Sequence, residues 1–194
     1  MTVRNAIAAM FGIGLLAVVY VIFAAARNPG SADRGDLAIG AMADFIVWDR
    51  PRPGPELGFT GAEGEDVTIA DFRGEAVLLN LWATWCAPCI EEMPALQALQ
   101  EDLSGESFRI AAVSVDREGA RKVTPFVDQL GVENLSIYFD PTMAFARSLK
   151  VQAGIPVTIL FDPRGREVGR VTGIADWDTP EAKTLIASVL PEQE

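Results

Sequence analysis

The chain of 194 residues opens with a long apolar stretch and then changes to segments in which apolar and polar positions alternate. Residues 6–26 contain no charged side chain. As a helix rising about 1.5 Å per residue, such a stretch can cross a hydrocarbon core of about 30 Å. The pattern predicts a transmembrane anchor over residues 1–27. A signal peptide cleaved near Ala24-Ala25-Ala26 is the alternative, although the apolar part of a signal peptide usually has only about 7–15 residues.

The segment after the anchor is polar and rich in residues that break helices and strands. It predicts a tether over 28–44, followed by a folded domain over 45–194. Two short apolar pieces, Phe45–Trp48 and Val67–Ile69, lie on either side of a proline-rich cluster. They predict an extra N-terminal hairpin at the start of the domain.

Strand and helix patterns then alternate along the chain. The apolar run 77–82 and the largely apolar segment 109–115 predict strands that are buried on both faces. Between them a helix is expected over 87–103, kinked by Pro94. Thr124-Pro125 and Gly131 are typical of the start and end of a second helix.

The C-terminal third predicts two further strand and helix pairs. A short strand over 136–139 precedes a helix that starts at Asp140-Pro141 and ends near Lys150. A turn at Asp162–Gly165 joins strands over 157–161 and 167–172 into an antiparallel hairpin. Thr179-Pro180 caps a last helix, whose apolar positions recur at helical spacing: Ala182, Leu185, Ile186, Val189 and Leu190. The order β-α-β-α-β-β-α predicts a three-layer α/β sandwich with a central mixed sheet.

The only two cysteines, Cys86 and Cys89, lie where the first of these strands meets its helix. A helix N-terminus stabilises a thiolate, so Cys86 is expected to attack a substrate disulfide and Cys89 to resolve the mixed disulfide. Pro88 fixes the backbone between them. A purely structural disulfide is the alternative, but closing so short a loop stabilises a fold little.

Composition narrows the possible functions. The net charge of −11 argues against nucleic-acid binding. The absence of histidine excludes Cys–His catalysis and most zinc or copper sites, so we expect no metal and no cofactor besides the Cys86–Cys89 disulfide. A single CxxC pair suits an extracytoplasmic space, although the distribution of Lys and Arg does not fix the orientation.

Several motifs together resemble the thioredoxin superfamily: Trp85-Cys86-Ala87-Pro88-Cys89, Pro94, and Gly154-Ile155-Pro156 before a strand. The lead-in Leu79–Cys86, the continuation Glu91–Leu96 and the segment Gly173–Trp177 are similar to its membrane-anchored TlpA/ResA branch, TlpA above all. The resemblance implies a thioredoxin-like fold and a thiol:disulfide oxidoreductase. It also implies a single-pass protein of the inner membrane with its catalytic domain on the periplasmic side.

The resemblance assigns further roles around the two cysteines. Pro156 matches the cis-proline, which places Ile155 beside the cysteines with its backbone free to pair with a client. Trp85, Ala87 and Pro88 are expected to contact the client. Thioredoxin has a buried aspartate where this chain has Asn80, so proton transfer is assigned to Glu92, three residues after Cys89 and on the same helix face.

The leading interpretation is therefore a membrane-tethered reductase of disulfides in client proteins. By resemblance, the clients are copper-handling proteins of cytochrome oxidase assembly or apocytochrome c, and a membrane thiol carrier supplies electrons. The soluble domain is expected to be monomeric. One alternative is a metallochaperone that holds Cu(I) with Cys86 and Cys89. Another is a peroxiredoxin-like peroxidase, which is disfavoured because Ala83 stands where such enzymes have threonine.

Overall fold

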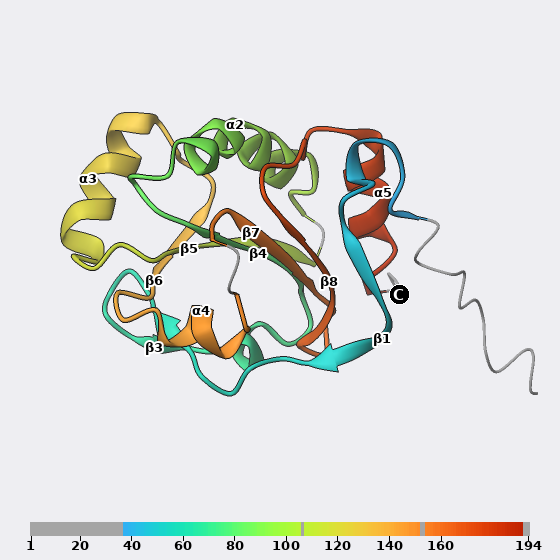
Figure 1. The fold of residues 1–194 in the computed structure, drawn as a ribbon, viewed down its shortest axis with the longest axis horizontal. Coiled ribbons are helices and arrows are strands. Elements are labelled where there is room, and N and C mark those ends of the chain that lie inside the picture. The colour runs from blue at the N-terminus through green and yellow to red at the C-terminus, as the bar shows by residue number, and fades with distance from the viewer. Residues whose placement is uncertain (1–36, 106, 152–153, 192–194) are drawn as a thin grey trace, which may run out of the picture. The chain divides into compact units, whose positions relative to one another are not determined.

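The computed structural model describes residues 37–105, 107–151 and 154–191. These residues form one eight-stranded sheet with helices on both faces (Figure 1). The strand order β1-β8-β7-β4-β5-β6-β2-β3 combines parallel and antiparallel neighbours, which confirms the predicted α/β class and mixed sheet. The predicted anchor and most of the tether lie outside the described residues. Within the described ranges, no helix has both the length and the apolar character needed to cross a membrane.

The centre of the sheet is made of strands whose side chains are buried on both faces. All seven residues of β4 (Ala76–Trp82) are buried, as its continuous apolar run predicts. It pairs in parallel with β5 (Phe108–Ser114), which pairs in parallel with β6 (Ser136–Phe139). On its other side β4 pairs antiparallel with β7 (Val157–Phe161).

Helices cover the two faces of this sheet. Helices α2 (Ala87–Asp102) and α3 (Ala120–Leu130) lie on one face, and α4 (Ala144–Ser148) lies on the other (Figure 1). The last helix, α5 (Pro180–Ala187), begins where predicted, because the Thr179 side chain accepts a hydrogen bond from the backbone N–H of Ala182. It lies beside the end of α2, where Lys183 Nζ is 2.6 Å from Asp102 Oδ2.

The predicted N-terminal hairpin is wrong. β1 (Ile46–Pro53), which contains Pro51 and Pro53, pairs with β8 (Arg166–Thr172) at one edge of the sheet. β3 (Asp66–Val67) pairs with β2 (Phe59–Thr60) at the opposite edge. The first apolar piece lies almost wholly in β1, whereas only Val67 of the second lies in β3, and each strand completes a different edge of the sheet. A short alternating pattern indicates a strand without indicating its neighbour.

Two helix starts also differ from the sequence prediction. α3 begins at Ala120 after Gly119, whose positive φ of 56° suits glycine, so Thr124 and Pro125 lie inside the helix. α4 begins at Ala144, with Met143 as its N-cap residue, although the Asp140 side chain still binds its first turn. The Asp140 carboxylate accepts hydrogen bonds from the backbone N–H groups of Ala144 and Ala146, at 2.9 Å each. A side chain four residues upstream satisfies the helix start, so residues 140–143 form a turn instead.

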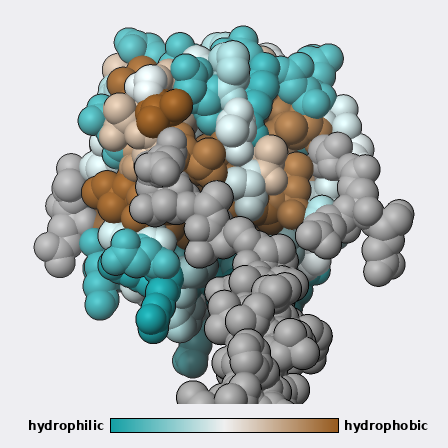
Figure 2. Space-filling model, turned by 90° about the vertical axis from the view of Figure 1, so that its right-hand side faces the viewer, coloured by the Kyte–Doolittle hydropathy of each residue, from teal (hydrophilic) through white to brown (hydrophobic). Residues whose placement is uncertain are grey.

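The folded part begins before residue 45. A short 3₁₀ helix, η2 (Gly40–Met42), packs against α5, and Met42 is only 1% exposed. A second one, η3 (Ile69–Phe72), starts with a capping box between Thr68 and Asp71. On the face that carries β1 and α5, apolar side chains lie among hydrophilic ones (Figure 2). Ile39, just before η2, and Ile46, in β1, are more than half exposed.

Candidate active site

The two cysteines lie at the end of the sheet where β4, β5 and β6 finish and β7 starts. Cys86 is the N-cap residue of α2, and Cys89 is in the first turn of that helix. They form a disulfide bond. Cys86 is 5% exposed and Cys89 is fully buried. The sulfur of Cys86 is therefore the more accessible of the two, and the order of attack stays a prediction.

A buried carboxylate fixes the loop that leads into Cys86. Both the backbone N–H and the hydroxyl of Thr84 donate to Asp116, at 2.8 and 2.7 Å. Lys122 Nζ donates to the same carboxylate at 2.8 Å and Ser114 Oγ at 3.0 Å. Burial alone would raise the pKa of Asp116, but the hydrogen bonds from Lys122, Thr84 and Ser114 outweigh it, and the pKa is lowered. Asp116 thus ties the loop after β4 to the loop after β5.

The residues expected to contact a client lie around Cys86. The Ile155–Pro156 peptide bond is cis, and the Ile155 carbonyl oxygen lies 3.7 Å from Cys86 Sγ. Pro156 is buried, whereas Ile155 is half-buried. Trp85 has 65% of its surface exposed, and Ala87 and Pro88 are exposed beside it. An apolar surface therefore borders the reactive sulfur.

Glu92 differs from its neighbour Glu91 in its surroundings. Glu91 is exposed, whereas Glu92 is 2% exposed and its Oε1 accepts a hydrogen bond of 2.6 Å from Asn80 Nδ2. Burial, which disfavours the charged form, raises the pKa of Glu92 to about 7, and the Asn80 hydrogen bond opposes this rise only in part. Such a carboxyl can gain and lose a proton near neutral pH, as the predicted role requires.

The sequence analysis predicted neither the hydrogen bond between Asn80 and Glu92 nor the position of Trp177. Asn80 is fully buried and also donates a hydrogen bond of 2.9 Å to Oγ1 of Thr158. Thr158 lies two residues after Pro156. The N–H groups of Trp177 and Ala175 oppose the raised pKa of Glu92, although the buried Trp177 indole makes no hydrogen bond of normal geometry. An amide inside an otherwise apolar strand was the available signal, since a buried amide needs partners.

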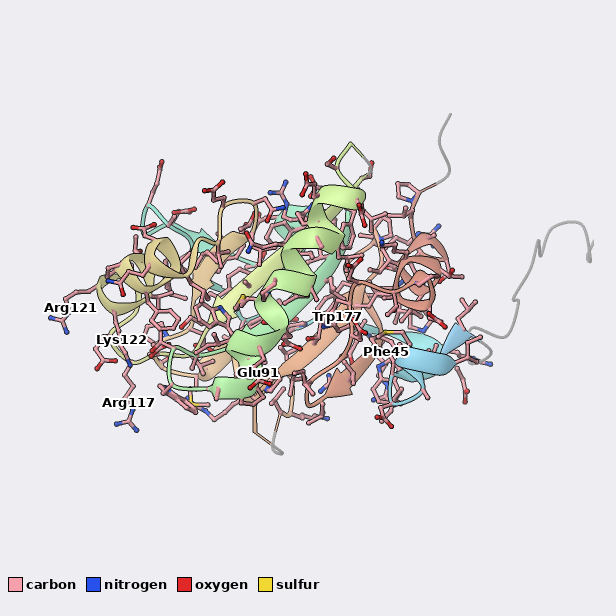
Figure 3. All side chains as sticks on the ribbon, turned by 90° about the horizontal axis from the view of Figure 1, so that it is seen from above. Phe45, Glu91, Arg117, Arg121, Lys122 and Trp177 are labelled. Atoms are coloured by element: carbon pink, nitrogen blue, oxygen red, sulfur yellow. A yellow bond between two sulfur atoms is a disulfide. The ribbon has the colours of Figure 1, made fainter. Side chains whose placement is uncertain are left out.

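Charged side chains are distributed unevenly around this end of the domain. Arg117, Arg121 and Lys122 extend from the start of α3, while Trp177 lies on the other side of α2 (Figure 3). Glu91 lies along α2 between them (Figure 3).

Among the described side chains, no group of three or more His, Cys, Asp or Glu is arranged to hold a metal ion.

Comparisons with known proteins agree with this geometry. Residues 52–166 match the model of the AhpC/TSA family. The thiol-disulfide oxidoreductase ResA of Geobacillus thermodenitrificans is 31% identical over 160 residues, which cover 82% of this chain and 81% of that protein. A DsbF homologue from Corynebacterium diphtheriae aligns with a TM-score of 0.62 and 28% identity, over 75% of this chain and 92% of that one. A thiol:disulfide interchange protein of the thioredoxin family from Chlorobium tepidum aligns with a TM-score of 0.57 and 23% identity, over 71% and 97%, which shows the shared fold.

Proposed function

Because the chain belongs to the AhpC/TSA family and is a ResA-like thiol-disulfide oxidoreductase, we propose that it acts as a reductase of disulfides in client proteins. The observation that carries this proposal is the Cys86–Cys89 disulfide at the start of α2, with the carboxyl of Glu92 buried in the same helix. A dithiol beside a proton acceptor of near-neutral pKa can pass two electrons to another disulfide and handle the accompanying proton.

In the proposed cycle, the Cys86 thiolate of the reduced enzyme attacks one sulfur of the client disulfide. A Cys86–client bond forms, and the other client sulfur leaves as a thiolate that takes up a proton. Glu92 then accepts the proton of the Cys89 thiol. The Cys89 thiolate attacks Cys86 Sγ, so that the Cys86–Cys89 bond forms and the second client thiolate leaves. The client gains two electrons, and the enzyme is oxidised to the form in the structure.

The client is proposed to bind as an extended segment. Ile155 would offer its backbone to that segment, and the exposed ring of Trp85 would cover apolar side chains next to the client cysteine. Ala87 and Pro88 complete the contact surface on the helix side. Because the chain carries a net charge of −11, we do not expect a nucleic-acid partner.

The cellular setting follows from the apolar N-terminal segment and the resemblance to TlpA. We propose that residues 6–26 hold the protein in the inner membrane with its catalytic domain in the periplasm. A membrane thiol carrier would then return electrons to the Cys86–Cys89 pair. Copper-handling proteins of cytochrome oxidase assembly and apocytochrome c are the proposed clients.

The reduction potential of the Cys86–Cys89 pair tests the proposed direction of electron flow. The full chain in detergent micelles is equilibrated with glutathione or dithiothreitol buffers, and the oxidised fraction is measured by thiol labelling. A potential at or below about −220 mV is expected of a reductase. A value near about −120 mV would identify a disulfide donor and reverse the assignment. If no disulfide forms while the reduced pair retains Cu(I), the metallochaperone alternative replaces the proposal.

A further inference from the structure

Three polar atoms near the active site are buried without a hydrogen-bond partner. They are Glu92 Oε2, Asn80 Oδ1 and Trp177 Nε1, and they belong to side chains that surround one carboxyl group. A buried polar atom without a partner destabilises a fold, so three around one group call for an explanation. Their chemical types suggest one.

The three atoms differ in what they can do. Asn80 Oδ1 can only accept a hydrogen bond, and Trp177 Nε1 can only donate one. Glu92 Oε2 changes with protonation, because it accepts when the carboxyl is ionised and can donate when it carries the proton. The protonated form of Glu92 can therefore donate to Asn80 Oδ1, and the ionised form can accept from Trp177 Nε1.

We propose that Asn80 and Trp177 are positioning residues that divide the two protonation states of Glu92 between them. The protonated carboxyl pairs with the Asn80 amide through two hydrogen bonds, from Nδ2 to Oε1 and from the Oε2 hydroxyl to Oδ1. The ionised carboxyl keeps the first bond, loses the second and accepts instead from the Trp177 indole N–H. The inference rests on the proposed function in one respect: in that function, the proton that Glu92 gains comes from the Cys89 thiol.

The bond already present supports this division. Asn80 Nδ2 donates to Glu92 Oε1 at 2.6 Å, and its second hydrogen goes to Thr158 Oγ1 at 2.9 Å. The amide group is thereby held from two sides, on β4 between α2 and β7. Its oxygen has no other partner, so it is available to accept from the protonated carboxyl and complete a cyclic acid–amide pair.

The groups that act on Glu92 in the oxidised protein are uncharged. Burial, the Asn80 amide, the Ala175 N–H and the Trp177 indole determine its raised pKa. The chain has no histidine, and in the oxidised protein both cysteines are in the disulfide. Glu92 is therefore expected to titrate near neutral pH with little interference, so the switch can be observed without a client.

The test is a pH titration of the oxidised full chain in detergent micelles, followed by NMR of carboxyl carbons and of ¹⁵N-labelled indoles. Four tryptophans give four indole signals. The Trp177 signal is expected to move with the same midpoint as the Glu92 carboxyl, and Glu92→Gln should abolish both changes. A Trp177 signal that stays fixed while Glu92 titrates would overturn the proposal. This measurement needs no Trp177 or Asn80 variant, so it remains informative if they do not fold.

Variants give the sign of each contribution. Trp177→Phe removes a donor that serves only the ionised form, so the proton affinity of Glu92 should rise about tenfold, a shift of about one pH unit. Trp82→Phe is the matched control: it removes another buried indole N–H without a partner, from a ring that lies against Phe126. An unchanged midpoint in Trp177→Phe, or an equal shift in Trp82→Phe, would contradict the assignment.

The Asn80→Leu variant tests which protonation state of Glu92 the Asn80 side chain stabilises. It removes two hydrogen bonds from the protonated form and one, stronger bond from the ionised form, so its effects on the midpoint oppose each other. The midpoint should therefore move less than in Trp177→Phe. A rise as large as that of Trp177→Phe would mean that Asn80 serves the charged form, and would overturn the division. Because no client is present, these results do not depend on whether the protein reduces disulfides in the cell.

Discussion

Among single residues, Glu92 has the most unusual environment in the domain. It is a carboxyl buried in a helix that packs on an apolar sheet, with one hydrogen bond at Oε1 and a pKa of about 7. Water solvates the charged form of Glu92 better than the protein interior does, so ionisation of Glu92 destabilises the folded state. The price of having a proton acceptor beside the disulfide is therefore a loss of stability at neutral and alkaline pH.

Glu92→Gln should make this cost measurable. In the folded protein Glu92 keeps its proton up to about pH 7, because its pKa is raised to about 7 from the ordinary value of 4.5. The free energy of unfolding therefore falls as the pH rises between these two values. At about 1.4 kcal/mol per pH unit, the free energy of unfolding falls by about 3 kcal/mol over this interval. The Glu92→Gln variant should not show this fall, because glutamine does not ionise. Urea unfolding of the oxidised proteins should show the variant gaining on the wild type between pH 5 and pH 8. An equal difference at both pH values would contradict the raised pKa.

Among the elements, the loop between β4 and α2 depends on its neighbour after β5. Thr84 lies two residues before Cys86, and both of its polar groups bind Asp116. The Asp116 carboxylate also accepts from Lys122 at the start of α3. The position of the reactive sulfur is therefore fixed by a residue in the loop after β5, whose buried carboxylate accepts four hydrogen bonds.

Asp116→Asn should loosen this loop. One carboxylate oxygen becomes an NH₂ group that faces donors, so at least one buried bond is lost, at a cost of about 2 kcal/mol. We expect a lower free energy of unfolding and faster hydrogen exchange at the Thr84 amide. Asp128→Asn, on the exposed part of α3, is the matched control and should change neither. Unchanged exchange at Thr84 in Asp116→Asn would show that the loop holds its position by packing alone.

Local chemistry explains which elements could be predicted. The turn at Asp162–Gly165 and the Thr179 cap act within a few residues, so the β7–β8 hairpin and the start of α5 were predicted correctly. The partners of β1 and β3 depend on which sheet edge is open, and no local pattern contains that information. The cysteine pair follows from its spacing. The bond between Asn80 and Glu92 does not, because it joins a strand to a helix through the core.

At the scale of the whole molecule, residues 40–45 are part of the folded domain. Met42 and Phe45 are buried, and η2 packs on α5 near the end of the chain. The interpretation of 28–44 as a tether does not anticipate this, because Met42 lies within the predicted tether and a single turn of 3₁₀ helix is too short to give a periodic signal. The described fold is closed by residues from both ends of its sequence.

Met42→Ala should therefore destabilise the whole domain and not only its N-terminal turn. Truncating a fully buried methionine costs about 2–5 kcal/mol. Ile39→Ala, three residues earlier and 59% exposed, should cost less than about 0.5 kcal/mol. Thermal unfolding of both variants, followed by circular dichroism, provides the comparison. Equal stability of the two would mean that η2 folds and unfolds independently of the sheet.

The two edges of the sheet have a consequence for crowding. A strand at an edge can capture the edge of a neighbouring molecule and start an aggregate, and a long, regular strand does so most readily. Here β3 is only two residues long, and β1 contains two prolines, which have no backbone N–H to donate. Neither edge is a good template for a further strand. Copies of the domain at high local concentration can therefore lie side by side without joining into a continuous sheet.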